Sequence, residues 1–77
     1  MNKARRKTIE IVAASIENAI SELEMCRDEE QNYYDNMPDS LRDSSKGEAA
    51  DDCISNLDDA ISSLEDALNS VNSSIEL

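Results

Sequence analysis

Carboxylates and two thiols are the side chains of this 77-residue chain whose types and spacing suggest chemistry. Cys26 and Cys53 supply at most half of a zinc site, because the chain has no histidine to complete it. Histidine is also the side chain that most often acts as a general base near neutral pH. We therefore assign no catalytic residue, no metal site and no cofactor, and we predict that the protein is not an enzyme.

Paired carboxylates recur every seven residues in the second half of the chain. The six residues are Asp51, Asp52, Asp58, Asp59, Glu65 and Asp66. Seven residues are close to two helical turns, so the pairs form a column on one face of a helix. At about one charge per ~4 Å, this column approaches the charge spacing of one DNA strand. It is interpreted either as a solvated helix face or as a nucleic-acid mimic that binds a basic protein surface.

The basic residues are concentrated at the start of the chain. Lys3, Arg5, Arg6 and Lys7 make up four of the seven Lys and Arg residues, and all 18 Asp and Glu residues follow them. We expect this basic segment either to pair with Glu76 and the terminal carboxylate or to bind an anion such as a nucleotide phosphate. The remaining acidic surface is expected to repel DNA and anionic membranes and to attract basic partners.

Two stretches with helical periodicity must position these groups. In the second half, apolar residues alternate at intervals of three and four, the pattern of a bundle helix. In the first half, the predicted seam has the same alternation, with Ala13, Ile20 and Tyr34 in a flanking column. The first seam consists of Ile9, Val12, Ile16, Ala19, Leu23, Cys26, Glu30, Tyr33 and Met37. These patterns predict helices over about 3–36 and 45–74.

A turn over residues 37–44 separates the two predicted helices. Pro38 disfavours helical backbone at Met37. Ser45 with Glu48 fits a capping box that starts the second long helix, while Ser40 with Asp43 offers an earlier start, with a short turn of helix at 39–43. Tyr33 is expected to cover the end of the core. Tyr34 is a candidate anchor for a binding partner, because exposed aromatic side chains often serve that purpose.

The predicted fold is all-α: a single domain, 1–77, forming an antiparallel helical hairpin. Each helix has three apolar columns, more than a two-helix contact covers, so we expect a homodimer that forms a four-helix bundle, with a monomeric hairpin as the alternative. The expected core residues are Ile9, Ile16, Ile20, Leu23, Ile54, Leu57, Ile61, Leu64, Leu68 and Val71. No apolar run is long enough to cross a membrane and no signal peptide is evident, so we expect a cytoplasmic protein with reduced thiols.

The sequence resembles small acidic helical-hairpin proteins encoded by phages and prophages of Gram-positive bacteria. The resemblance covers most of the chain, and its most specific part is the segment from Tyr33 to Pro38, followed by the Ser45–Glu48 cap and the Ile/Leu/Ala repeat. It implies an accessory protein that acts by binding a host enzyme or defence component. It implies no catalytic residues.

Three functional hypotheses follow from the sequence. The first is a dimeric binding protein that inhibits a host defence or nucleic-acid-handling protein through its acidic column. The second is a sponge that sequesters a nucleotide immune signal where basic N-termini meet between protomers. The third is a structural or adaptor dimer without a dedicated site.

Overall fold

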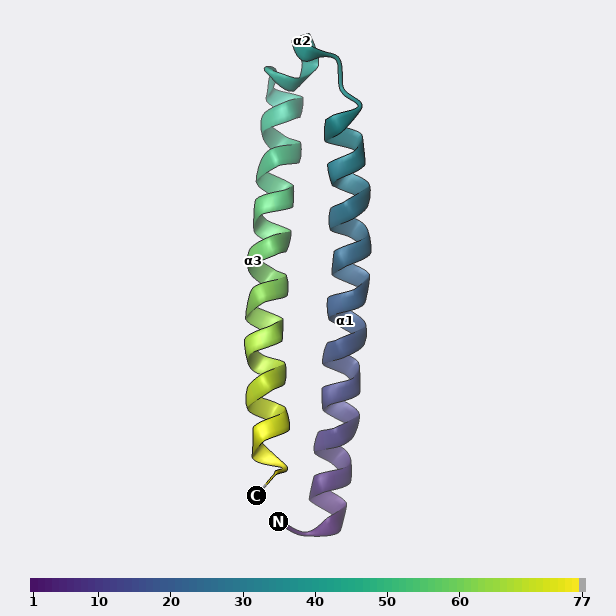
Figure 1. Ribbon diagram of the computed structural model, residues 1–77, viewed down its shortest axis with the longest axis vertical. Helices are drawn as coiled ribbons and strands as arrows, with labels where there is room; N and C mark the ends of the chain where they lie inside the picture. Colours follow the sequence, from purple (N-terminus) through teal and green to yellow (C-terminus); the bar gives the residue numbers. More distant parts are fainter. Residues whose placement is uncertain (77) are drawn as a thin grey trace.

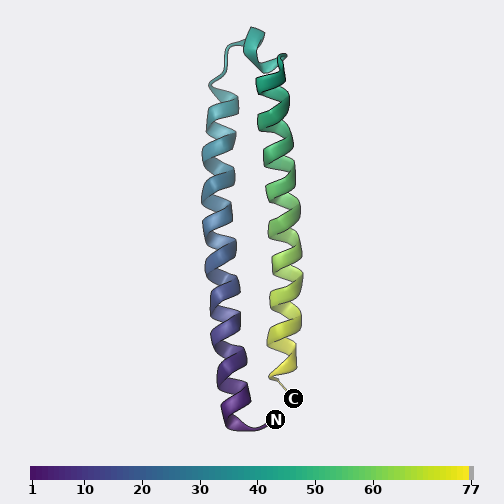
Figure 2. The same ribbon diagram turned by 180° about the vertical axis from the view of Figure 1, so that it is seen from behind.

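The computed structural model describes residues 1–76 as an all-α hairpin (Figure 1). Its helices are α1 (Lys3–Asp35), α2 (Asp39–Arg42) and α3 (Ser45–Ser74). The long helices α1 and α3 run antiparallel side by side, with both termini at one end and α2 at the other (Figures 1 and 2). The all-α class and the hairpin expected from the periodicity are confirmed. Leu77, the last residue of the expected domain, lies outside the described residues.

The ends of α1 follow from local hydrogen bonding. The Asn2 side chain accepts a hydrogen bond of 2.7 Å from the backbone N–H of Arg5, so asparagine, a favoured N-cap residue, starts the helix. At the other end the backbone N–H of Asn36 still donates to the Asn32 carbonyl, and Met37 donates to Tyr34 at 3.1 Å. Pro38 follows directly and prevents continuation of the helix.

The start of α3 differs by one residue from the predicted capping box. Ser44, not Ser45, is the N-cap: its hydroxyl accepts a hydrogen bond of 3.3 Å from the backbone N–H of Lys46. Ser44 has the extended backbone that an N-cap requires, with φ −95° and ψ 177°, whereas Ser45 is already helical. The hydroxyl of Ser44 also donates to the Leu41 carbonyl, which links α2 to α3.

The short helix α2 lies tightly against the first turn of α3 at Gly47. A Cβ atom built on Gly47 would lie 1.9 Å from the Arg42 carbonyl oxygen and 2.5 Å from its carbonyl carbon. Both of these are backbone atoms, so a side chain at position 47 requires the chain to move. Gly47 is therefore needed for close approach of the backbone rather than for an unusual φ angle.

The contact between α1 and α3 uses a different column of α1 from the predicted one. Val12 and Tyr33, expected in the seam, are 45% and 53% exposed, and Cys26 is exposed as well. The column that faces α3 instead contains Ala13, Ile20, Arg27 and Tyr34, all buried or half-buried. Both columns alternate with Ile9, Ile16 and Leu23 at intervals of three and four. The prediction took the column without an arginine, but the long stem of Arg27 packs between the helices while its charged end reaches solvent.

The core of a single hairpin is thin. The buried apolar residues are Ala13, Met37, Ala50, Ile54 and Ile61, and no side chain among those described is fully buried. The other expected core residues lie between the helices but are half-buried: Ile9, Ile16, Ile20, Leu23, Leu57, Leu64, Leu68 and Val71. The radius of gyration of 17.4 Å, against about 11 Å for a compact chain of this length, reflects this elongated shape.

Candidate functional site

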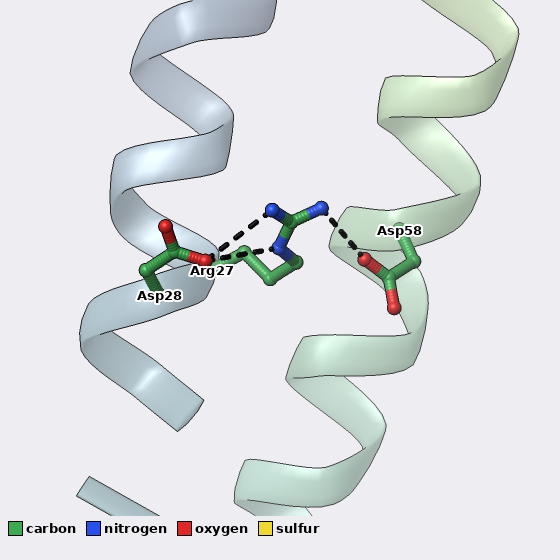
Figure 3. A network of polar contacts seen from close by, with 3 residues as sticks. All are labelled: Arg27, Asp28 and Asp58. Carbon is green, nitrogen blue, oxygen red and sulfur yellow. Dashed lines mark hydrogen bonds and ion pairs between the residues drawn. The ribbon is translucent and has the colours of Figure 1, made fainter. Parts of the chain in front are cut away.

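The hairpin has two long flanks of different chemistry, and an ion pair identifies them. Arg27 of α1 reaches Asp58 of α3 at 3.2 Å, so Asp58 and Arg27 lie on the same flank of the helix contact (Figure 3). Asp51 and Glu65, seven residues before and after Asp58, continue this flank along α3. We call it the acidic flank. The opposite side of the helix contact is called the uncharged flank, because α3 has no charged residue there.

The six carboxylates singled out in the sequence all lie exposed along α3. They are Asp51, Asp52, Asp58, Asp59, Glu65 and Asp66. Asp51, Asp58 and Glu65 border the contact with α1, while Asp52, Asp59 and Asp66 follow them by one residue and point further outward. Among the residues described, Asp58 is the member of this set that forms an ion pair. We call the six residues the acidic ridge.

A second row of carboxylates on α1 faces the same flank and was missed by the sequence analysis. Glu10, Glu17 and Glu24 recur every seven residues, and Glu24 lies one turn before Arg27 on its side of the contact. Glu10 and Glu17 are exposed and Glu24 is half-buried. The seven-residue spacing of these glutamates is visible in the sequence. Their place on the acidic flank is not, because it depends on the rotation of α1 that brings Arg27, rather than Cys26, to face α3.

Arg27 is the cation of α1 that pairs with the acidic ridge of α3. Its guanidinium donates to Asp58 and also to Asp28 at 3.3 Å, so it lies between two carboxylates (Figure 3). The hydrogen bond to Asp58, and after it the one to Asp28, raises the pKa of Arg27. The arginine thus offsets part of the carboxylate repulsion around Asp58, and the ridge carboxylates still face solvent.

Tyr34 lies inside the turn rather than on an open surface. It is half-buried, and the guanidinium of Arg42 lies 5.6 Å from its ring centroid, within the range of a cation–π contact. Arg42 also donates to the carbonyl oxygens of Asp35 at 3.3 Å and Met37 at 3.1 Å. Tyr33, expected to cover the core, is the exposed tyrosine. Tyr34 therefore has a structural environment, and Tyr33 has the exposure expected of a contact residue.

The basic residues near the N-terminus lie beside the end of α3. Lys3, Arg5 and Lys7 are exposed, whereas Arg6 is half-buried and donates a hydrogen bond to the carbonyl oxygen of Ile75. A cation at a helix C-terminus interacts favourably with the helix dipole. The terminal carboxylate that was expected to pair with this segment belongs to Leu77, outside the described residues.

Cys26 and Cys53 are free, exposed thiols on the uncharged flank. Within residues 1–76 the structure has no pocket and no group of three or more side chains arranged to hold a metal ion. None of the described helices combines the length and apolar character of a membrane span. The arrangement offers an extended charged surface, which is suited to contact with another macromolecule.

Comparison with known proteins gives no relative: no family model matches the chain, and neither a curated protein nor a solved structure matches it.

Proposed function

We propose that the protein is a non-enzymatic binding protein that docks its acidic flank on a basic surface of a host defence or nucleic-acid-handling protein. The observation that carries the proposal is the acidic ridge of α3 together with the row formed by Glu10, Glu17 and Glu24, which borders the same side of the helix contact. We further propose that the protein is encoded by a phage or prophage and acts in the cytoplasm of the host cell, where Cys26 and Cys53 stay reduced.

The charge density of the flank supports mimicry of nucleic acid. The ridge carries six carboxylates over about 22 Å of helix, which is one charge per ~4 Å. One DNA strand carries one phosphate per ~3.4 Å, so the two charge spacings are similar. The glutamates of α1 add a second row on a helix about 8–10 Å away. Two acidic rows of this kind resemble the two phosphate backbones that border a groove, and a basic cleft built for DNA attracts such a surface.

The finer architecture that we propose is a homodimer in which two hairpins form a four-helix bundle. The half-buried leucines of the hairpin and its thin core support an additional contact. Such a bundle presents one acidic flank on each protomer, so a single dimer has two binding surfaces. The hydrogen bond from Arg6 to Ile75 favours local pairing over a nucleotide site at the basic N-terminus.

Capture from a bacterial lysate tests the proposal. Immobilised protein is expected to retain DNA-binding proteins at about 50 mM NaCl, and these are expected to elute with about 500 mM NaCl, because salt screens charge pairs. Added double-stranded DNA should release the same proteins, since it competes for the same basic surface.

Two matched variants link capture to the acidic ridge. Asp59→Lys/Asp66→Lys reverses two exposed ridge charges and should abolish capture. Glu22→Lys/Glu29→Lys changes the net charge equally on exposed positions of α1 outside the ridge and should retain it. Equal capture by both variants, or retention that DNA does not release, contradicts mimicry.

A further inference from the structure

The uncharged flank of the hairpin is the surface that neither the acidic ridge nor the contact between α1 and α3 uses. On α3 it contains no charged residue: Ala49, Cys53, Asn56, Ala60, Ser63, Ala67, Ser70 and Ser74 lie along it at alternating intervals of four and three. On α1 its central column consists of Arg5, Val12, Ala19, Cys26 and Tyr33, and the exposed Glu22 and Glu29 lie beside this column on its outer side. In a chain with a formal net charge of −11, a whole flank of α3 without charge is a distinct surface.

Burial along α3 shows which side of the core is uncovered. Ile54 and Ile61, which lie toward the acidic flank, are 9% and 4% exposed. Leu57 and Leu64 alternate with them, lie toward the uncharged flank, and are only half-buried. The leucines are thus covered by α1 on one side and open on the other. A partner on the uncharged flank completes their burial, and removal of apolar surface from water favours this association.

We propose that the uncharged flank binds the same flank of a second copy of this chain. This inference specifies the dimer named in the proposed function. Charge favours this occupant, because two chains that each carry −11 repel one another less where α3 has no charged residue than where the acidic rows would meet. The flank also extends along a hairpin whose face measures 59 by 14 Å, comparable in size with the ~800 Å² that each partner contributes to a standard interface.

The small side chains of the uncharged flank suit this contact. Alanine, serine and cysteine are small enough for helices of the two copies to approach closely. The exposed Val12 and Tyr33 supply apolar area, and tyrosine is enriched in protein interfaces. In the resulting bundle Leu23, Leu57 and Leu64 of both copies lie toward the centre, and the half-buried Glu30 follows Leu23 in the same column, nearer the turn. Both acidic flanks then face outward on opposite sides, away from the interface.

Two variants with equal charge test this assignment by sedimentation equilibrium or light scattering of the purified chain. Ser63→Glu/Ser70→Glu places two charges on the uncharged flank, whereas Ser62→Glu/Asn69→Glu places two charges one residue earlier, on the acidic side of α3. The unmodified protein and the second variant are expected to have twice the 8.5 kDa chain mass. The first variant is expected to have a dimer dissociation constant raised about 100-fold or more, because like charges then meet in the interface.

The native thiols give a second readout that needs no substitution. Cys26 and Cys53 are exposed in the single hairpin and are covered in the proposed dimer. Their reaction with a thiol reagent such as 5,5′-dithiobis(2-nitrobenzoate) should therefore slow as protein concentration rises into the dimeric range. A helical circular dichroism spectrum of Ser63→Glu/Ser70→Glu shows that it is folded and separates dissociation from unfolding.

Several results would overturn the assignment. If the chain is monomeric at all concentrations, the flank does not bind a second copy. If both variants dissociate equally, the dimer contact lies on another surface. Thiol reactivity that does not depend on concentration also rejects it. Because these measurements use the purified chain alone, they are independent of capture: Asp59→Lys/Asp66→Lys should stay dimeric even where it fails to bind a basic protein.

Discussion

At the scale of single residues, the turn depends on two groups that the sequence pattern does not mark as important. Gly47 looks like an ordinary glycine near the start of a helix, and Arg42 like one of the few basic residues in an acidic chain. In the structure Gly47 permits backbone contact between α2 and α3, and Arg42 donates to two carbonyl oxygens around the end of α1. Neither role follows from periodicity, because both depend on how the chain reverses direction.

Gly47→Ala is expected to destabilise the hairpin by about 1–3 kcal/mol, because the added Cβ collides with backbone atoms of Arg42. Helix propensity alone predicts the opposite sign, a gain of about 0.5–1 kcal/mol. Urea unfolding followed by circular dichroism measures the difference. Ala49→Gly, at an exposed position in the same helical turn, serves as the control and should lose about 1 kcal/mol through propensity. A Gly47→Ala protein more stable than the parent disproves the close contact.

Arg42→Ala is expected to lower stability by about 1–3 kcal/mol, because it leaves the carbonyl groups of Asp35 and Met37 without this donor. It also removes the guanidinium from the ring of Tyr34. Arg42→Lys should restore little, because an ammonium group lacks the planar fork of a guanidinium. Thermal melting measures both variants. Lys46→Ala removes the same charge from an exposed site, and its melting temperature should stay close to that of the parent. An equal decrease for Lys46→Ala would show that the loss of positive charge alone explains the effect of Arg42→Ala.

At the scale of elements, the number, type and approximate ends of the two long helices follow from the three-and-four spacing of apolar residues and from Pro38. The face that α1 turns toward α3 does not. Ile9, Ile16 and Leu23 fit two columns equally well, one through Val12 and Cys26 and the other through Ala13 and Arg27. A stripe three columns wide is apolar enough for two contacts, so hydrophobicity alone does not decide which column faces the neighbouring helix of the same chain.

The same ambiguity explains which parts of the candidate surfaces the sequence predicted. The acidic ridge lies within one helix, so its spacing alone places it on one face. The row formed by Glu10, Glu17 and Glu24 lies on the other helix, and its position depends on the register and rotation of α1 against α3. The two tyrosines follow the same shift. Tyr33 belongs to the predicted seam, but Tyr34 belongs to the column that faces α3, so Tyr34 is the half-buried residue and Tyr33 the exposed one.

Ile61→Ala is expected to destabilise the hairpin by about 2–4 kcal/mol, because Ile61 is 4% exposed and contributes to the contact between α1 and α3. Ile11→Ala makes the same change at a side chain that is 62% exposed and should remain within about 0.5 kcal/mol of the parent. Chemical unfolding gives both values. Equal losses for the two variants show that Ile11 is covered as well, contrary to the arrangement of the helices described here.

At the scale of the whole molecule, charge is separated across the hairpin. One flank carries a row of carboxylates from each long helix, and α3 has no charge on the other. The separation concentrates repulsion on one side, where Arg27 offsets part of it. Folding is therefore opposed by like charges along the acidic flank, whereas the uncharged flank remains available for apolar contact.

Raising NaCl from about 10 mM to about 1 M is expected to increase the melting temperature, because screening over a shortened Debye length weakens repulsion among the carboxylates. The effect on partner binding should have the opposite sign, since the same screening weakens attraction to a basic surface. Scanning calorimetry or circular dichroism melting measures the first effect.

The triple variant Asp52→Lys/Asp59→Lys/Asp66→Lys separates repulsion from general effects of salt on the fold. These three residues are exposed on the outer side of α3, so their reversal leaves the contact with α1 intact while it lowers the charge of the flank. The variant should melt at a higher temperature than the parent at low salt, and its melting temperature should respond less to added NaCl. A parent protein that melts at a lower temperature as salt is added would instead show that ion pairs such as Arg27–Asp58 outweigh repulsion in the folded hairpin.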